Sequence, residues 1–255
     1  MQILHTAAEV KARLRPLQAQ GIKVGLVPTM GALHEGHLSL VRQLAPDVEV
    51  VAASIFVNPM QFGPKEDLAK YPRDLAGDAA KLASVGCHLV YAPDAIDVYP
   101  PGFQTAVEVS EVSQGLCGAV RPGHFRGVTT VVMKLFQVVR PDIAIFGEKD
   151  FQQLTVLRQM ASDLALDVEV RGAPLVRDPD GLAMSSRNAY LSPEERARAL
   201  SISRGLGAAR AAYEDGERDG AVLLGLVRAS LEVAALTPEY LELRSFRELR
   251  ALERA

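Results

Sequence analysis

The chain has 255 residues, of which 48% are hydrophobic, and its formal net charge is −3 at pH 7. This length suits one large domain, or a large and a small one, each with its own core. Positive and negative residues are interspersed along the chain, and no block of basic residues is present to neutralise a phosphate backbone. We therefore expect that the protein does not bind nucleic acid.

The N-terminal segment and the cysteines bear on where the protein works. The first 18 residues, "MQILHTAAEVKARLRPLQ", contain no apolar core typical of a signal peptide. No apolar run approaches the roughly 18 residues that a membrane span needs, so we expect no membrane partner. Cys87 and Cys117 form no CxxC pair and no disulfide framework. Together these features predict a cytoplasmic protein.

Short apolar runs alternate with segments of helical spacing along the first two thirds of the chain. Several of these runs are apolar throughout, as in parallel strands covered by helices on both faces. In the helical segment that follows residue 148, Leu154, Leu157, Met160 and Leu164 fall on one face. We therefore expect an α/β fold with a Rossmann-like, doubly wound parallel sheet in a domain at 1–176. The predicted strands are 23–29, 48–57, 87–93, 142–147 and 168–176, and the predicted helices 6–19, 37–45, 67–85, 127–139 and 149–165.

A second unit is expected at 177–255. In "SPEE", Ser192 suits an N-cap, Pro193 the first helical position and Glu195 the third position of a capping box. A long Ala/Arg-rich helix, the turn "GERDG", another helix and a strand "EYLELRS" at 239–245 follow. This order predicts a smaller C-terminal α/β domain.

The stretch "PTMGALHEGHLSL", 28–40, places His34 and His37 at the start of the first helix that follows a strand. Free backbone N–H groups and the helix dipole attract anions there, and two imidazoles can hydrogen-bond a polyphosphate. Gly36 would let a flat base pack against backbone. A metal pair is less favoured, because HEGH has neither i,i+4 spacing nor a third ligand. Two solvated histidines in a polar loop remain the plain alternative.

The stretch "SIFVNPMQF", 54–62, runs from an apolar strand into Asn58 and Gln61. Ligands of open α/β sheets bind at the carboxyl ends of strands, and amides suit the hydroxyl and carboxylate groups of a small substrate. An ordinary Asn-Pro turn is the alternative.

The stretch "DIAIFGEKDFQQL", 142–154, again ends a strand at the start of a helix. Lys149 could meet phosphate there, with Gln153 one turn further along. The alternative is a solvated charge cluster in which Asp150 favours the helix N-terminus.

The stretch "VRDPDGLAMSSRNAYLS", 176–192, carries Ser185, Ser186 and Arg187 at the predicted domain junction. A loop with two hydroxyls and a guanidinium can close on a triphosphate and stabilise the departing pyrophosphate. A Ser-rich linker is the alternative.

In this order and at these spacings, the four stretches resemble the pantothenate synthetase (pantoate–β-alanine ligase) family, and the resemblance covers nearly the whole chain. It implies an adenylate-forming ligase of the nucleotidyltransferase superfamily. Such an enzyme would convert Mg²⁺-ATP and pantoate to pantoyl adenylate and pyrophosphate, and β-alanine would then release AMP and pantothenate. It also implies a homodimer and a mobile gate at 62–74.

Roles are carried over by matching motif position. His34, His37 and Lys149 would be catalytic, acting on the phosphates, and His37 could also donate a proton to pyrophosphate. Gln61, Gln153 and Asn58 would bind the substrates, and the one metal implied is the Mg²⁺ that accompanies ATP. The implied ATP-binding residues are Met30, Gly31, Ala32, Leu33, His34, Glu35, Gly36, His37, Gly147, Glu148, Lys149, Asp150, Val176, Met184, Ser185, Ser186 and Arg187.

Two features of this chain differ from the pattern of the family. The Ser-rich loop lacks the lysines of the tRNA-synthetase KMSKS signature, which makes Lys149 the main candidate for a phosphate cation. The chain ends at "LRALERA", where the family normally continues.

Three other classes of protein are alternatives to this resemblance. A nucleotidyltransferase that adenylates a phosphorylated cofactor precursor would need extra basic residues in place of Gln61 and Gln153. A tRNA ligase is disfavoured by the charge, and a non-enzymatic ATP-binding module by the filled motif positions.

Overall fold

A six-stranded parallel sheet forms the centre of the molecule, in the order β1-β4-β3-β2-β5-β6. The computed structural model describes residues 1–64 and 66–255. All five predicted strands are confirmed, with shorter bounds. The sequence missed β1, a three-residue strand whose partner, β4, is about 85 residues away in the sequence. The strands are β1 (Gln2–Leu4), β2 (Val24–Thr29), β3 (Val50–Ile55), β4 (Leu89–Tyr91), β5 (Ile143–Gly147) and β6 (Glu169–Ala173).

The strand order reverses between β2 and β5. After β2 the chain adds β3 and β4 on one side, whereas β5 and β6 are added on the other. The loops that leave the carboxyl ends of β2 and β5 therefore diverge, and a crevice opens between them. The loop after β2 leads to His34, and the loop after β5 leads to Lys149.

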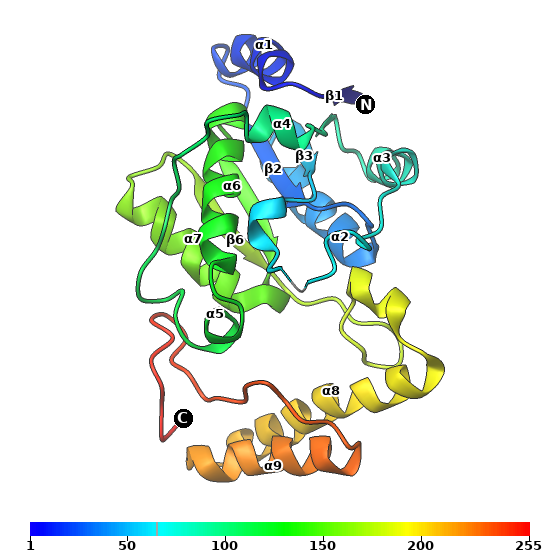
Figure 1. Cartoon of the computed structure of the whole chain (residues 1–255), viewed down its shortest axis with the longest axis vertical. Coiled ribbons are helices and arrows are strands. Elements are labelled where there is room, and N and C mark those ends of the chain that lie inside the picture. Colours follow the sequence, from blue (N-terminus) through cyan, green and yellow to red (C-terminus); the bar gives the residue numbers. More distant parts are fainter. Residues whose placement is uncertain (65) are drawn as a thin grey trace.

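Helices cover both faces of the sheet (Figure 1). On one face, α1 (Ala7–Gln18), α6 (His124–Val139) and α7 (Phe151–Asp163) pack over the larger apolar cluster. On the other, α2 (Glu35–Leu44) and α3 (Leu75–Ser84) pack over the smaller cluster. Within β2, Leu26 belongs to the first cluster and Val27 to the second, as the alternation of side chains along a strand requires. Both faces of the sheet are thus shielded from solvent, which explains the apolar runs in the sequence.

Helix boundaries differ from the predictions where caps intervene. The helix predicted from residue 67 begins at Leu75, because Asp74 caps it by accepting a hydrogen bond from the Gly77 N–H at 2.9 Å. Residues 67–73, which include Pro72, precede it as irregular chain. Helix α7 ends at Asp163, and Leu164, which we expected on its buried face, is 49% exposed.

Short helical segments connect several of these longer elements. They are η1 (Ala45–Asp47), η2 (Pro59–Gln61), α4 (Ala95–Val98), α5 (Leu116–Val120), η3 (Glu148–Asp150) and η4 (Ser186–Tyr190). Among the described helices, none is both long and apolar enough to cross a membrane.

The C-terminal part contains two long helices, α8 (Pro193–Glu214) and α9 (Gly220–Val233), which pack side by side (Figure 1). The predicted capping box of Ser192 and Glu195 is confirmed. The predicted strand at 239–245 is wrong. This segment makes one isolated bridge, Arg244 to Ala251, so it lacks the continuous ladder that defines a strand.

Candidate active site

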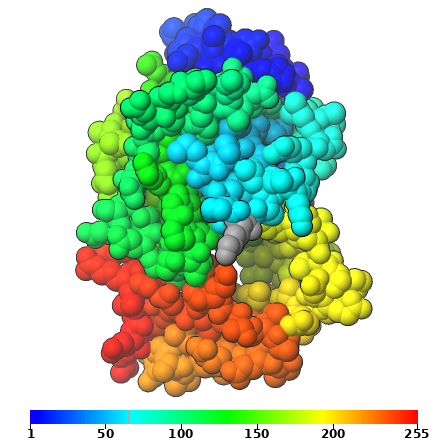
Figure 2. Space-filling model, viewed as in Figure 1, coloured from blue at the N-terminus to red at the C-terminus, as the bar shows by residue number. Residues whose placement is uncertain are grey.

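A cavity of about 250 Å³ lies at the carboxyl ends of β2 and β5. In the space-filling view the molecule is hollowed between the upper part, which holds the sheet, and the C-terminal part (Figure 2). Most of the residues implied by the family resemblance line this cavity. They are Met30, His34, Gly36, His37, Asn58, Gln61, Gly147, Lys149, Asp150, Gln153, Val176, Met184, Ser185, Ser186 and Arg187.

Five of the residues expected to bind ATP do not line the cavity: Gly31, Ala32, Leu33, Glu35 and Glu148. Leu33 belongs to the smaller apolar cluster, and Glu35 forms an ion pair with Arg42. Glu148 is exposed. The backbone of 31–33 shapes the loop that precedes His34.

A buried carboxylate holds this loop. Asp78 of α3 is 1% exposed, and it accepts hydrogen bonds from the backbone N–H groups of Ala32 at 2.7 Å and Leu33 at 2.8 Å. Ala32 has φ +50°, a conformation unusual for a residue with a side chain. Lys81 donates to the Leu33 carbonyl at 2.8 Å. Two side chains of α3 therefore fix the loop that carries the histidines.

His34 and His37 sit at the N-terminus of α2, where His34 is the N-cap. His34 Nδ1 accepts a hydrogen bond from the Gly36 N–H at 3.2 Å, and His37 Nδ1 accepts one from the His34 N–H at 3.3 Å. A Cβ at Gly36 would lie 2.9 Å from the His34 ring, so the cap requires glycine there. Because each Nδ1 is an acceptor, the ring proton of each neutral imidazole is on Nε2.

The electrostatics of the pair agree with neutral rings. Burial, then the neighbouring His34 and Lys149, lowers the pKa of His37 to about 3. Burial, then Lys149, also lowers the pKa of His34. Near pH 7 both side chains therefore act as N–H donors and not as cations.

Asn58 is the N-cap of the turn η2, which follows β3, and Gln61 is the last residue of that turn. Asn58 donates to Gln61 Oε1 at 3.0 Å and to the Gly127 carbonyl of α6 at 3.0 Å. A Cβ at position 127 would lie 2.3 Å from the Met60 carbonyl oxygen, so glycine is required for this close approach. The turn is thus held directly against α6.

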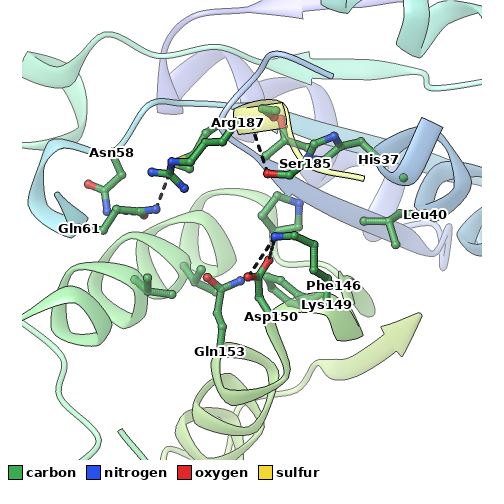
Figure 3. A pocket seen from close by; sticks show the side chains of 18 of the residues that line it. His37, Leu40, Asn58, Gln61, Phe146, Lys149, Asp150, Gln153, Ser185 and Arg187 are labelled. Carbon is green, nitrogen blue, oxygen red and sulfur yellow. Dashed lines mark hydrogen bonds and ion pairs between the residues drawn. The ribbon is translucent and has the colours of Figure 1, made fainter. Parts of the chain in front are cut away.

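Lys149, Asp150 and Gln153 enter the cavity from η3 and the first turn of α7 (Figure 3). The Lys149 ammonium lies 3.4 Å from both Asp150 carboxylate oxygens. Asp150 is the N-cap of α7 but makes no side-chain cap hydrogen bond. In the close-up, Asn58 and Gln61 come from another side of the same space, with Ser185 and Arg187 above.

The Ser-rich loop, within residues 176–192, also lines the cavity. Ser186 donates to the Ala32 carbonyl at 3.0 Å, which connects this loop to the histidine loop. Arg187 forms an ion pair with Asp67 at 2.9 Å, and its hydrogen bond lowers the pKa of that carboxyl. The predicted gate at 62–74 therefore contacts a cavity residue through Asp67, although its residue 65 lies outside the described residues.

The sequence interpretation assigned no role to two basic residues of the cavity, Arg121 and His124, which lie just before and at the start of α6. His124 Nδ1 donates to the Gln61 carbonyl at 2.8 Å, and its Nε2 accepts from Arg121 Nη1 at 3.2 Å. Arg121 also forms an ion pair with Glu66 at 2.5 Å. The available signal was the pattern "RPGH", two basic side chains around a glycine directly before an apolar helix.

Part of the cavity wall is apolar. Val128, Val131, Val132 and Leu135 of α6, together with Phe146 of β5, form it. Such a site combines donors for anions with a dry surface, which is typical of pockets for small organic substrates.

Known proteins resemble this chain over nearly its whole length. The family model described as pantoate-beta-alanine ligase matches residues 2–255. A pantothenate synthetase of Myxococcus xanthus is 58% identical over 242 residues, which cover 94% of this chain and 83% of the relative.

Two solved structures have the same fold. The crystal structure of pantothenate synthetase from Thermus thermophilus has a TM-score of 0.94 and 45% identity, and covers 100% of this chain and 91% of that one. A pantoate-beta-alanine ligase from Francisella tularensis, complexed with beta-gamma ATP and beta-alanine, has a TM-score of 0.78 and 34% identity, with 90% and 86% covered. The chain therefore belongs to the pantoate–β-alanine ligase family.

Proposed function

We propose that this protein joins pantoate to β-alanine at the expense of ATP, through a pantoyl adenylate, with release of pyrophosphate and AMP. One observation carries the proposal. Three groups suited to hydrogen-bonding phosphate, those of His34, His37 and Lys149, line the same cavity as the amides of Gln61 and Gln153. The membership of the family and the ligands of the Francisella tularensis relative support the choice of substrates.

The reaction needs activation because the oxygen of a carboxylate is a poor leaving group. Attack of the pantoate carboxylate on the α-phosphorus of ATP forms a carboxyl–phosphate bond and breaks the bond to pyrophosphate. The amine of β-alanine then attacks the acyl carbon, and AMP leaves with the electron pair of that bond. Both steps demand positioning and charge stabilisation rather than a protein nucleophile.

The chain supplies donors where negative charge develops. The Nε2–H groups of His34 and His37 and the Lys149 ammonium would hydrogen-bond the departing phosphates. Arg187 would add a bidentate guanidinium once the phosphates compete with Asp67 for it. Gln61 and Gln153 would hold the hydroxyl and carboxylate groups of pantoate.

We infer that Mg²⁺ enters with ATP. Within the described part of the chain, no three His, Cys, Asp or Glu side chains gather as a metal cage. Mg²⁺ commonly keeps several waters and is held by one or two carboxylates together with substrate phosphates. Asp150, at the cavity wall beside Lys149, fits such a carboxylate.

The acyl group would stay on AMP until the amine arrives. Cys87 is buried in the smaller apolar cluster, just before β4, and burial raises the pKa of its thiol to about 11. Cys117 is half-buried and makes a 3.9 Å contact with the Arg121 guanidinium. Neither thiol is one of the described groups that line the cavity, so neither is placed as an acyl carrier.

The decisive experiment is isotope exchange. With ATP, Mg²⁺ and pantoate but no β-alanine, the protein should exchange labelled pyrophosphate into ATP, and β-alanine should then release AMP. The double variant Cys87→Ser, Cys117→Ser should retain the exchange. Exchange that requires β-alanine, or that disappears in this variant, would contradict the two-step mechanism.

By the family resemblance we also propose a homodimer. Multi-angle light scattering should give about twice the chain mass of 27.5 kDa. A mass equal to one chain at micromolar concentration would contradict it.

A further inference from the structure

The side-chain amide of Asn58 is fully hydrogen-bonded in one orientation. Its Oδ1 accepts from the Tyr99 hydroxyl at 2.8 Å and from the Met60 N–H at 3.3 Å. Its Nδ2 donates to the Gly127 carbonyl and to Gln61 Oε1, each at 3.0 Å. Asn58 is 1% exposed. A rotated amide would therefore place its NH₂ against two donors and its oxygen against two acceptors, which burial makes unfavourable.

This arrangement determines the orientation of Gln61. Because Gln61 Oε1 is occupied by Asn58 Nδ2, the Gln61 NH₂ group is directed elsewhere, and Nε2 lies 3.0 Å from the sulfur of Met30, another cavity residue. A thioether is a weak acceptor that a better one can displace. Gln61 thus presents N–H donors, which suit the carboxylate or hydroxyl oxygen of a hydroxy acid.

Tyr99 supplies the shorter of the two hydrogen bonds that fix Asn58 Oδ1. It follows α4, and its ring packs against Phe56 and Phe103 at centroid distances of 6.2 and 5.1 Å. Burial raises the pKa of Tyr99 well above its usual value, so the phenol stays a donor. Tyr99 is not one of the described residues that line the cavity.

We propose that Tyr99 is a positioning residue: through Asn58, its hydroxyl fixes Gln61 with the NH₂ group toward the hydroxy-acid substrate. The proposal rests on the function proposed above, in which Gln61 binds pantoate. Without the hydroxyl, Asn58 Oδ1 keeps only the longer hydrogen bond from Met60. The Gly127 carbonyl still holds Nδ2, so the joint rotation of the Asn58 and Gln61 amides costs less free energy but is not free.

The test is Tyr99→Phe, which removes one hydroxyl and keeps the ring contacts. The KM for pantoate should rise about fivefold, the effect of one neutral hydrogen bond, while the KM for ATP changes less than twofold. Tyr91→Phe is the matched control, because Tyr91 is buried in β4 away from the cavity lining. It should leave both constants unchanged.

A double-variant cycle distinguishes positioning from a general structural effect. In a Gln61→Ala background, Tyr99→Phe should change the KM for pantoate less than twofold, because the group it positions is gone. A fivefold rise in both backgrounds, or an unchanged KM in Tyr99→Phe alone, would overturn the proposal. Pantoate-dependent AMP formation by the wild-type protein is measured first, since its absence would instead refute the proposed function.

Discussion

The rings of His34 and His37 lie 4.1 Å apart at the start of α2, and the Nδ1 atom of His37 accepts a hydrogen bond from the His34 backbone N–H. The pair is therefore part of the helix cap as well as of the cavity. These cap hydrogen bonds use the Nδ1 atom of each ring as an acceptor. Each neutral ring therefore donates through its Nε2–H group. Two adjacent cations would repel each other here, whereas two neutral donors can share one polyphosphate.

The first prediction separates a hydrogen-bond donor from a proton donor at His37. His37→Ala should slow adenylate formation roughly 10²–10³-fold, as the loss of one transition-state donor does. His37→Gln should retain more activity than His37→Ala, because its amide still provides an N–H. Rapid-quench measurement of the first half-reaction checks this. Equal activity of the two variants would favour a proton transfer by the imidazole.

The second prediction concerns acid stability. The pKa of His37 is about 3 in the folded protein and about 6.5 when unfolded. The unfolded state therefore binds more protons between these values, and the free energy of unfolding falls as pH drops from 6.5 towards 3. Urea denaturation at pH 7 and pH 4.5 should show a smaller pH effect in His37→Gln than in the wild type. The same pH effect in both would refute the buried neutral ring.

The third prediction concerns Lys149. Lys149→Ala should slow adenylate formation by more than tenfold, since the ammonium faces the cavity beside Asp150. Lys11→Ala, on the exposed side of α1, serves as the control and should have no effect. A tenfold or smaller loss at Lys149 would instead indicate a solvated charge cluster.

The fourth prediction addresses substrate selectivity. Gln61→Ala and Gln153→Ala should each weaken pantoate binding by about 1–3 kcal/mol, because a buried polar group of the substrate then lacks its partner. ATP binding should change little. Calorimetric titration with each substrate checks this, and wild-type affinity for pantoate in both variants would contradict the assignment.

The fifth prediction concerns the support of the histidine loop. Asp78→Asn should lower the free energy of unfolding by about 1–3 kcal/mol, because the new NH₂ group would face the N–H of Ala32 or of Leu33. Asp94→Asn is the control, since Asp94 is exposed and makes no cap hydrogen bond. Equal unfolding free energies for the two variants in urea would show that Asp78 does not hold the loop.

Local patterns predicted much of this molecule. The apolar runs indicated the strands, and the stretch 28–40 predicted that His34 and His37 lie at a helix N-terminus, which the structure confirms. The expected parallel topology predicted ligand binding at the carboxyl ends of strands, and the cavity lies there, at β2 and β5. The division of the chain at residue 177 stays a prediction.

Long-range contacts account for what the sequence did not show. Asp78 supports a loop 45 and 46 residues earlier in the chain, and His124 contacts a carbonyl 63 residues away. Neither side chain belongs to a periodic pattern, because each serves a partner that only the fold brings near. The strand predicted at 239–245 failed for the related reason that a strand depends on a neighbour, which local spacing cannot supply.

The close contact between Gly127 and the turn η2 has a consequence for how the protein opens. Three residues of 3₁₀ helix have little stability of their own, and the turn keeps its shape because α6 lies against it and accepts the Asn58 hydrogen bond. Amide hydrogens of the turn and of the first turns of α6 should therefore exchange with solvent as one cooperative unit. The protection of the turn η2 against exchange then comes from α6, whose other face is buried in the larger apolar cluster.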